Sequence, residues 1–192
     1  AAGDNPFTLT VYGTPGEENI SGKYIMIRNG CTFEELDVAL MMHGGPATQT
    51  DIKCLANAEY DLTYHGKAAH AALKPEAGRS SLDAMCLAFH GMECLREHVT
   101  DDVRLHYNIT DNVVPSLTKA QVMVRANTVK AVKELMVRLE KIFQGAALMT
   151  ETEVEAKVGK ILDNKIPNLQ LNDILMKHAR ALQAPNCQPP RQ

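Results

Sequence analysis

Apolar residues recur at helical spacing in two stretches near the middle of the chain. The first stripe consists of Leu82, Met85, Phe89, Met92 and Leu95, and the second of Val129, Val132, Leu135, Met136, Leu139, Ile142 and Phe143. Steps of three and four residues place such side chains on one helix face, so the pattern predicts two amphipathic helices. Gly145 is expected to end the second helix.

Four further segments predict strands, at residues 58–65, 103–109, 119–126 and 152–158. Together with the two helices, they give the order strand, helix, strand, strand, helix, strand. This order describes a ferredoxin-like βαββαβ sheet with both helices on one face, complete between residues 58 and 158. The other face of the sheet is then free for a partner.

The segment before this domain predicts a βαβ unit. Residues 7–12 predict a strand that runs into a Gly/Pro turn, residues 22–30 a short helix, and residues 37–42 a buried parallel strand. Because such sheets carry their chemistry at the carboxyl ends of strands, we expect the polar residues after both strands on one edge. After the domain, the sequence predicts a helix near 169–182 and a disordered Pro/Gln-rich tail.

Composition excludes several classes of partner. The chain has 192 residues, a net charge of -3, 5% aromatic residues and no tryptophan, so it lacks both the cationic surface and the stacking platforms that nucleic acids require. The sequence contains neither an apolar run long enough to span a membrane nor an N-terminal signal segment. Five cysteines without CxxC spacing indicate reduced thiols, with Cys86 and Cys94 in the core, and a cytoplasmic protein.

Two acidic residues and a histidine follow the predicted strands of the first segment. Glu17 and Glu18 come directly after the Gly/Pro turn, where one carboxylate can bind a metal while its neighbour handles a proton. His43 follows the buried apolar strand, and imidazole is a common zinc ligand. Solvated surface charge for the Glu pair, and a loop or core position for His43, remain open.

Three residues of the predicted ferredoxin-like domain are further candidates. His70 lies in a small-residue stretch that permits close backbone approach, with helix capping or packing as the alternative. Asn112 either has a role in the site or makes an Asx turn between strands. Arg125 ends a strand and has the planar fork that clamps a carboxylate.

Six short motifs appear in the order that one family shows. They are residues 13–18 (GTPGEE), 37–43 (DVALMMH), 66–72 (GKAAHAA), 78–84 (GRSSLDA), 112–115 (NVVP) and 145–150 (GAALMT). This order resembles metallopeptidase family twenty, the aminoacylase, carboxypeptidase and amidohydrolase group of co-catalytic zinc peptidases. It is most similar to the branch of amidohydrolases and p-aminobenzoyl-glutamate hydrolases that cleave N-acyl amino acids or dipeptides, over roughly residues 7–180.

The resemblance implies a role for each candidate of the first segment. Glu17 is expected to be the general base that activates water, Glu18 a ligand of one metal ion and His43 a ligand of the other. The implied metal is zinc, with manganese or cobalt as alternatives. A small amide or dipeptide is the implied substrate.

The resemblance also assigns the candidates of the inserted domain. His70 is expected to reach a partner subunit's active site and stabilise the oxyanion, while Asn112 and Arg125 hold the substrate's carbonyl and carboxylate. The inserted domain, residues 58–158, would then act as a lid and as the surface of a homodimer. No nucleic acid or membrane partner is expected.

The expected fold is therefore α/β (α+β), in three parts. Residues 1–57 are expected to be a partial catalytic domain, 58–158 the dimerisation domain, and 159–192 a partial return with the tail. Glu18 and His43 alone are too few ligands for a two-metal site, so the chain is interpreted as an internal fragment of such an enzyme. A non-catalytic dimerisation module derived from the family is the alternative.

Overall fold

The computed structural model describes residues 6–45, 48–113 and 116–182, with the backbone alone at 19–20 and 111–113. The chain forms two compact units, Ala1–Pro46 and Ala47–Gln192. No helix among the described residues is long and apolar enough to cross a membrane.

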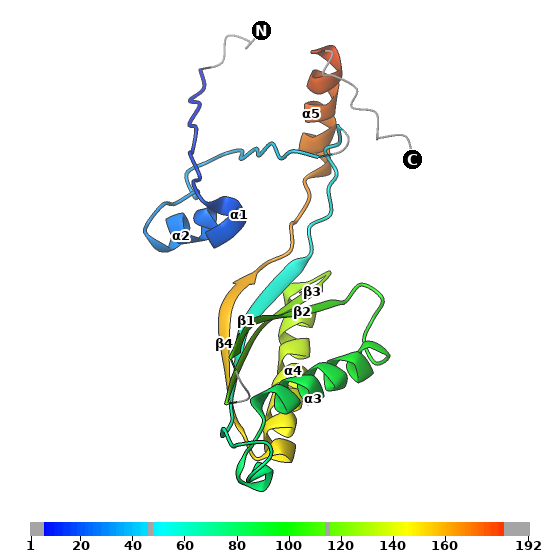
Figure 1. The fold of residues 1–192 in the computed structure, drawn as a ribbon. Coiled ribbons are helices and arrows are strands. Elements are labelled where there is room, and N and C mark those ends of the chain that lie inside the picture. The colour runs from blue at the N-terminus through cyan, green and yellow to red at the C-terminus, as the bar shows by residue number, and fades with distance from the viewer. Residues whose placement is uncertain (1–5, 46–47, 114–115, 183–192) are drawn as a thin grey trace. The chain divides into compact units, whose positions relative to one another are not determined.

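Four antiparallel strands make up the sheet of the second unit (Figure 1). Their order in the sheet is β2-β3-β1-β4. The first and last residues of the sheet come together, because Asn57 pairs with Leu162. The strands are β1 (Ala56–His65), β2 (Arg104–Val113), β3 (Leu117–Ala126) and β4 (Glu153–Leu162).

Two long helices complete the βαββαβ order and confirm the predicted α/β fold class. The helix α3 (Ser81–Arg96) lies over β1, β2 and β3, and α4 (Val129–Thr150) lies over β1, β3 and β4. Ser80 and Thr128 cap them, each side-chain oxygen accepting a hydrogen bond from the backbone N–H three residues on. The helices approach closely at Gly91, where a Cβ would lie 2.7 Å from Ile142 Cγ2.

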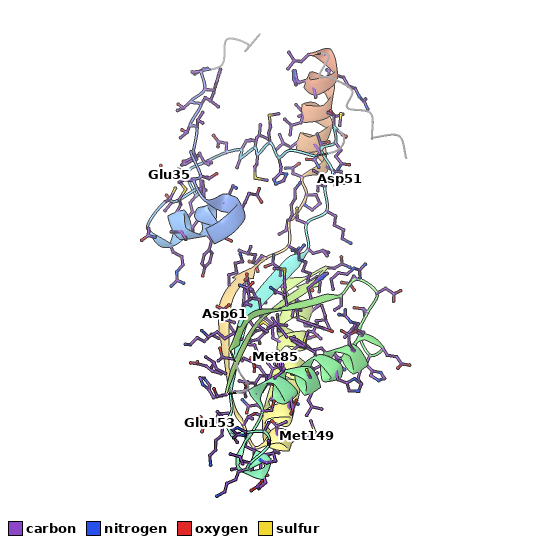
Figure 2. All side chains as sticks on the ribbon, viewed as in Figure 1. Glu35, Asp51, Asp61, Met85, Met149 and Glu153 are labelled. Carbon is purple, nitrogen blue, oxygen red and sulfur yellow. The ribbon has the colours of Figure 1, made fainter. Side chains whose placement is uncertain are left out.

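The core lies between the helices and one face of the sheet. Every second residue of β1 and β3 is buried, which is the alternation expected of a sheet with one covered face. Met85 of α3 belongs to this core, whereas Asp61 lies on the open face (Figure 2). Tyr60 and Phe143 meet edge to face with ring centroids 5.7 Å apart. The open face is polar, with Lys160 paired to Glu59 at 3.4 Å.

Two predictions about the helices are wrong. The helix α4 does not end at Gly145 but continues to Thr150, because the turn after the glycine buries Ala146 and Ala147. Cys86 and Cys94 are exposed rather than in the core, since they lie on the face of α3 opposite its buried residues.

The first unit contains two short helices, α1 (Glu17–Ile20) and α2 (Gly22–Arg28). Residues 7–12 and 37–42 do not form the predicted strands, because a strand needs a hydrogen-bonded neighbour and the described residues pair none with them. In the second unit, η1 (Pro75–Ala77) precedes α3, and α5 (Leu169–Ala181) confirms the last predicted helix. The predicted disordered tail lies outside the described residues.

Candidate functional site

The Glu17–Glu18 pair is held on a tight turn between α1 and α2. Gly16 has φ 67° and caps α1, a left-handed backbone conformation that glycine adopts without cost. Gly22 approaches the Pro15 carbonyl so closely that a Cβ there would lie 2.0 Å from its oxygen. The GTPGEE motif therefore fixes the backbone from which both carboxylates project.

Glu17 has two contacts, both with Lys23. Its Oε2 accepts a hydrogen bond from the Lys23 backbone N–H at 2.7 Å, and its Oε1 lies 3.4 Å from the Lys23 ammonium. A carboxylate offers about four lone-pair sites, so these bonds orient Glu17 and leave it able to accept a further proton.

Glu18 and His43, the two predicted metal ligands, lie together in the structure. Glu18 Oε1 is 3.4 Å from His43 Nε2. His43 Nδ1 lies 2.7 Å from the Gly44 carbonyl oxygen, which only accepts hydrogen bonds, so Nδ1 carries a proton. In the neutral ring, Nε2 then presents its lone pair toward Glu18, as metal-bound histidines do when a carbonyl holds their other nitrogen.

The geometry of this pair fits a divalent metal ion, but the pair is incomplete as a site. Two ligands at about 2.0–2.1 Å from one tetrahedral zinc lie about 3.4 Å apart, which matches the separation of Glu18 and His43. A carboxylate and an imidazole are suitable donors for zinc or manganese. Within residues 6–45, 48–113 and 116–182, no cluster of three or more His, Cys, Asp or Glu side chains adds further ligands.

His70 lies on the exposed loop between β1 and α3. Its Nδ1 accepts a hydrogen bond from the Ala72 backbone N–H at 3.2 Å. In the neutral ring this bond puts the proton on Nε2, so the imidazole presents an N–H donor away from its own loop. A donor of this kind is what an oxyanion stabiliser requires.

The two predicted substrate-binding residues belong to the hairpin of β2 and β3. The Asn112 side chain lies outside the described residues, so its role stays a prediction. Arg125 lies on the open sheet face, with Nη2 3.1 Å from Met123 Sδ. Directly opposite on β2 is Arg104, a neighbour that the sequence did not indicate. Two adjacent guanidinium groups favour an anion between them.

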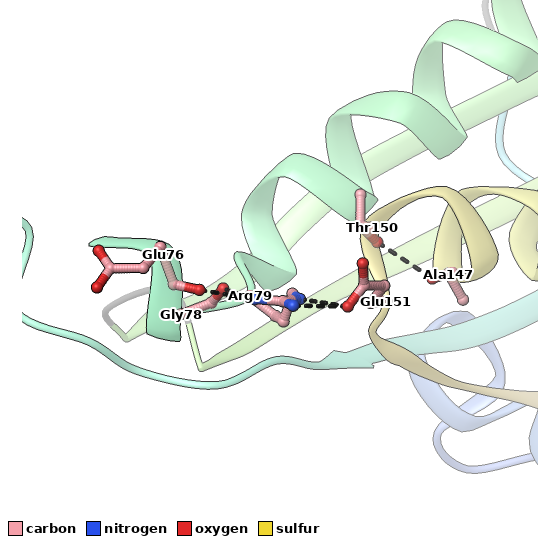
Figure 3. Close-up of polar contacts among 6 residues, drawn as sticks. All are labelled: Glu76, Gly78, Arg79, Ala147, Thr150 and Glu151. Atoms are coloured by element: carbon pink, nitrogen blue, oxygen red, sulfur yellow. Dashed lines mark hydrogen bonds and ion pairs between the residues drawn. The ribbon is translucent and has the colours of Figure 1, made fainter. Parts of the chain in front are cut away.

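Arg79 is the other residue that sequence reasoning missed. Its guanidinium binds Glu151, with Nη2 2.6 Å and Nε 2.8 Å from Oε2 (Figure 3). The GRSSLDA motif was a signal for this residue, but the motif does not identify a partner that lies 72 residues away. The next residues of the motif have structural roles, since Ser80 caps α3 and Ser81 Oγ lies 2.9 Å from Thr118 Oγ1.

Comparison with known proteins identifies relatives for most of the chain. Residues 56–151 match the family described as "Peptidase dimerisation domain". One of the chains of p-aminobenzoyl-glutamate hydrolase from Escherichia coli (strain K12) is 39% identical over 175 residues, which cover 88% of this chain and 36% of that protein. Xaa-Arg dipeptidase from Homo sapiens is 32% identical over 183 residues, covering 92% of this chain and 42% of that protein. The chain thus spans about two fifths of the length of these curated relatives.

Solved structures resemble the chain in fold. An aminobenzoyl-glutamate utilization protein from Klebsiella pneumoniae aligns with a TM-score of 0.55 and 24% identity, over 74% of this chain and 36% of that one. An amidase of the hydantoinase/carbamoylase family from Burkholderia vietnamiensis aligns with a TM-score of 0.59 and 12% identity, over 70% of this chain and 34% of that one. At these identities the alignments support a shared fold.

Proposed function

Because the chain belongs to metallopeptidase family twenty through its peptidase dimerisation domain, we propose that it serves a metal-dependent hydrolase of amide bonds. The substrates we propose are N-acyl amino acids or dipeptides. Two relatives support this class by their names, since one is a p-aminobenzoyl-glutamate hydrolase and another an Xaa-Arg dipeptidase. The Glu18–His43 pair is the observation in the structure that carries the proposal.

In this proposal the first unit supplies a base and two metal ligands. Glu18 and His43 would hold a divalent ion, zinc in the first instance, together with ligands from outside the described residues. When bound, such an ion supplies Lewis acidity to water and to the amide carbonyl. Glu17, oriented by Lys23, takes the proton from the attacking water and returns it to the leaving amine.

The second unit supplies groups that bind the substrate. His70 donates its Nε2 proton to the oxygen of the scissile carbonyl as negative charge develops there. Arg125, with Arg104 beside it, binds the substrate's carboxylate, and Asn112 holds the carbonyl. A free carboxylate next to the amide is therefore the feature that we expect substrates to share.

We further propose that the partner is a second copy of the chain, bound through residues 58–158. The matched family description names dimerisation. Two relatives are named as different subunits of one hydrolase, so a related second chain is the outcome that would replace the homodimer. The free cysteines Cys31, Cys54, Cys86 and Cys94 fit a reducing compartment, and we propose the cytoplasm.

The test is hydrolysis of a panel of N-acyl amino acids and dipeptides by the purified chain, with zinc or manganese supplied. Glu17→Gln should lower kcat by about 100-fold or more, because the variant removes the proton acceptor. Glu34→Gln is the matched control, an exposed glutamate of the same unit, and should leave kcat unchanged. If the chain binds metal and dimerises without turning over any substrate, the non-catalytic dimerisation module replaces the hydrolase.

A further inference from the structure

The loop that carries His70 is closed at its base by backbone hydrogen bonds. Lys67 and Arg79 form an isolated antiparallel bridge, each N–H donating to the other's carbonyl oxygen at 2.8 Å. One residue earlier, the Gly66 N–H donates to the Ser116 carbonyl at 2.8 Å. The two arms of the loop therefore leave the domain side by side.

His70 is coupled to the returning arm of this loop. Leu73 and Lys74 donate their backbone N–H groups to the His70 carbonyl, at 3.1 and 3.0 Å, and so form a turn around it. The arms then pack together at Gly78, where a Cβ would lie 3.0 Å from the Ala69 Cβ. A shift of the returning arm must therefore move the residue next to His70.

A single guanidinium group ties the returning arm to the end of α4. Arg79 donates two hydrogen bonds to Glu151 Oε2, and its Nη1 donates to the Glu76 carbonyl at 3.2 Å and to the Gly78 carbonyl at 2.6 Å (Figure 3). Arg79 thus orders the returning arm and fastens it outside the loop. Both side chains of the ion pair are partly exposed, at 37% for Arg79 and 71% for Glu151.

Glu151 has a backbone conformation that disfavours any side chain. It follows the last turn of α4 with φ 53° and ψ 40°, and the Thr152 N–H donates to the Ala147 carbonyl at 3.0 Å. Glycine is the usual residue at this left-handed position after a helix, because a Cβ is strained there. A glutamate here loses stability relative to glycine, and what it supplies in return is the carboxylate that binds Arg79.

We propose that Arg79 and Glu151 are positioning residues that fix the His70 loop to the end of α4. Their contribution is the placement of the loop rather than the stability of the domain, since an exposed ion pair stabilises a fold very little. The loop restraint stands on the structure alone. Its effect on catalysis, through His70, rests on the proposed function.

Glu151→Gly in the full chain tests this proposal, because the two roles predict opposite signs. Removing the side chain relieves the left-handed strain, so the thermal midpoint should stay the same or rise. Amide hydrogen exchange at Lys67 and Arg79 should become about fivefold faster, while Gly66 and Thr152 keep their protection. Unchanged exchange at Lys67 and Arg79 would overturn the proposal, as would loosening that also affects Gly66 and the core strands.

Two further variants separate charge from backbone effects. Glu151→Gln keeps the strain and removes the ion pair, and it should loosen the same two amides. The double variant R79E/E151R reverses both charges and should restore their protection, which a structural role of either side chain alone does not predict. Glu153→Gln, two residues further on in β4, is the matched control and should change neither amide.

The catalytic consequence has a separate readout. If the chain hydrolyses its substrates, Glu151→Gln should lower kcat several-fold at unchanged KM, and the double variant should recover it. Loosened amides in a chain without turnover would support the loop restraint and count against the hydrolase. Full turnover with loosened amides would overturn the claim that the pair acts through His70.

Discussion

The two candidate histidines are held by opposite hydrogen bonds, and this difference separates their chemistry. His43 has its proton on Nδ1, where it meets the Gly44 carbonyl, which leaves Nε2 as an electron-pair donor. His70 accepts at Nδ1 from the Ala72 N–H, which leaves Nε2 as a proton donor. The first arrangement suits a metal ligand and the second an oxyanion stabiliser.

Glutamine and alanine at position 70 should therefore behave differently. His70→Ala removes the donor and should lower kcat by about 100-fold, the scale on which a lost oxyanion donor acts. His70→Gln places an amide N–H near the position of Nε2 and should retain part of that activity. Steady-state kinetics of both variants is the measurement, and equal losses in the two would contradict the donor role.

At the scale of elements, α3 is fastened to the edge strand β2 by one polar and aromatic cluster. Phe89 of the helix stacks on Tyr107 of the strand with ring centroids 3.9 Å apart. Glu93 accepts hydrogen bonds from Arg96 at 2.7 Å and from the Tyr107 hydroxyl at 2.9 Å. The Arg96 hydrogen bond, followed by that of Tyr107, lowers the pKa of Glu93 below its ordinary value.

This cluster should make the stability of the domain depend on acid. Because the folded-state pKa is the lower one, the contribution of Glu93 is fully present above its ordinary pKa and is lost as pH falls through the folded value. Glu93→Gln should lower the free energy of unfolding at pH 7 by less than about 1 kcal/mol, since the pair is exposed. Urea unfolding across pH 3–7 is the measurement.

The difference between wild type and Glu93→Gln should shrink toward acid pH. Glu97→Gln, at the end of the same helix, is the control and should be nearly neutral throughout. A constant difference at every pH would mean that Glu93 acts through packing rather than through its charge.

At the scale of the whole molecule, the two edges of the sheet differ in how well they resist pairing. The β4 edge alternates charged residues, with Lys157 and Glu155 joined at 3.0 Å, and its register with β1 shifts between Glu59 and Tyr60. The β2 edge instead exposes Ile109, at 44% of its surface. Charges and bulges discourage strand pairing, so β2 is the edge open to a partner.

Ile109→Lys should therefore weaken the proposed dimer. We expect the wild-type chain to sediment as a dimer at micromolar concentration, and the variant to dissociate at concentrations about tenfold higher or more. Ile161→Lys would disturb the core, so Val158→Lys on the exposed part of β4 is the suitable control and should stay dimeric. A dimer that is equally stable in both variants would move the interface elsewhere.

The parts of the fold that the sequence predicted are those governed by local periodicity. The stripe from Leu82 to Leu95 and the alternation of residues 58–65 place side chains on one face of an element, and the sheet follows from the order of elements. Strands at 7–12 and 37–42 failed because periodicity does not supply a hydrogen-bonded neighbour. The Arg79–Glu151 contact was missed for a similar reason, since it depends on a left-handed residue far away in sequence.

The pairing of Asn57 with Leu162 has a consequence for how this domain is built into longer chains. The chain enters and leaves the sheet at one spot, and just outside it the Lys165 N–H still reaches the Cys54 carbonyl at 3.3 Å. A host protein needs only two adjacent chain ends to accept such a domain in place of a surface loop. The domain is thus a transplantable cassette, and exchanging it at residues 55 and 163 between relatives should yield folded chimaeras.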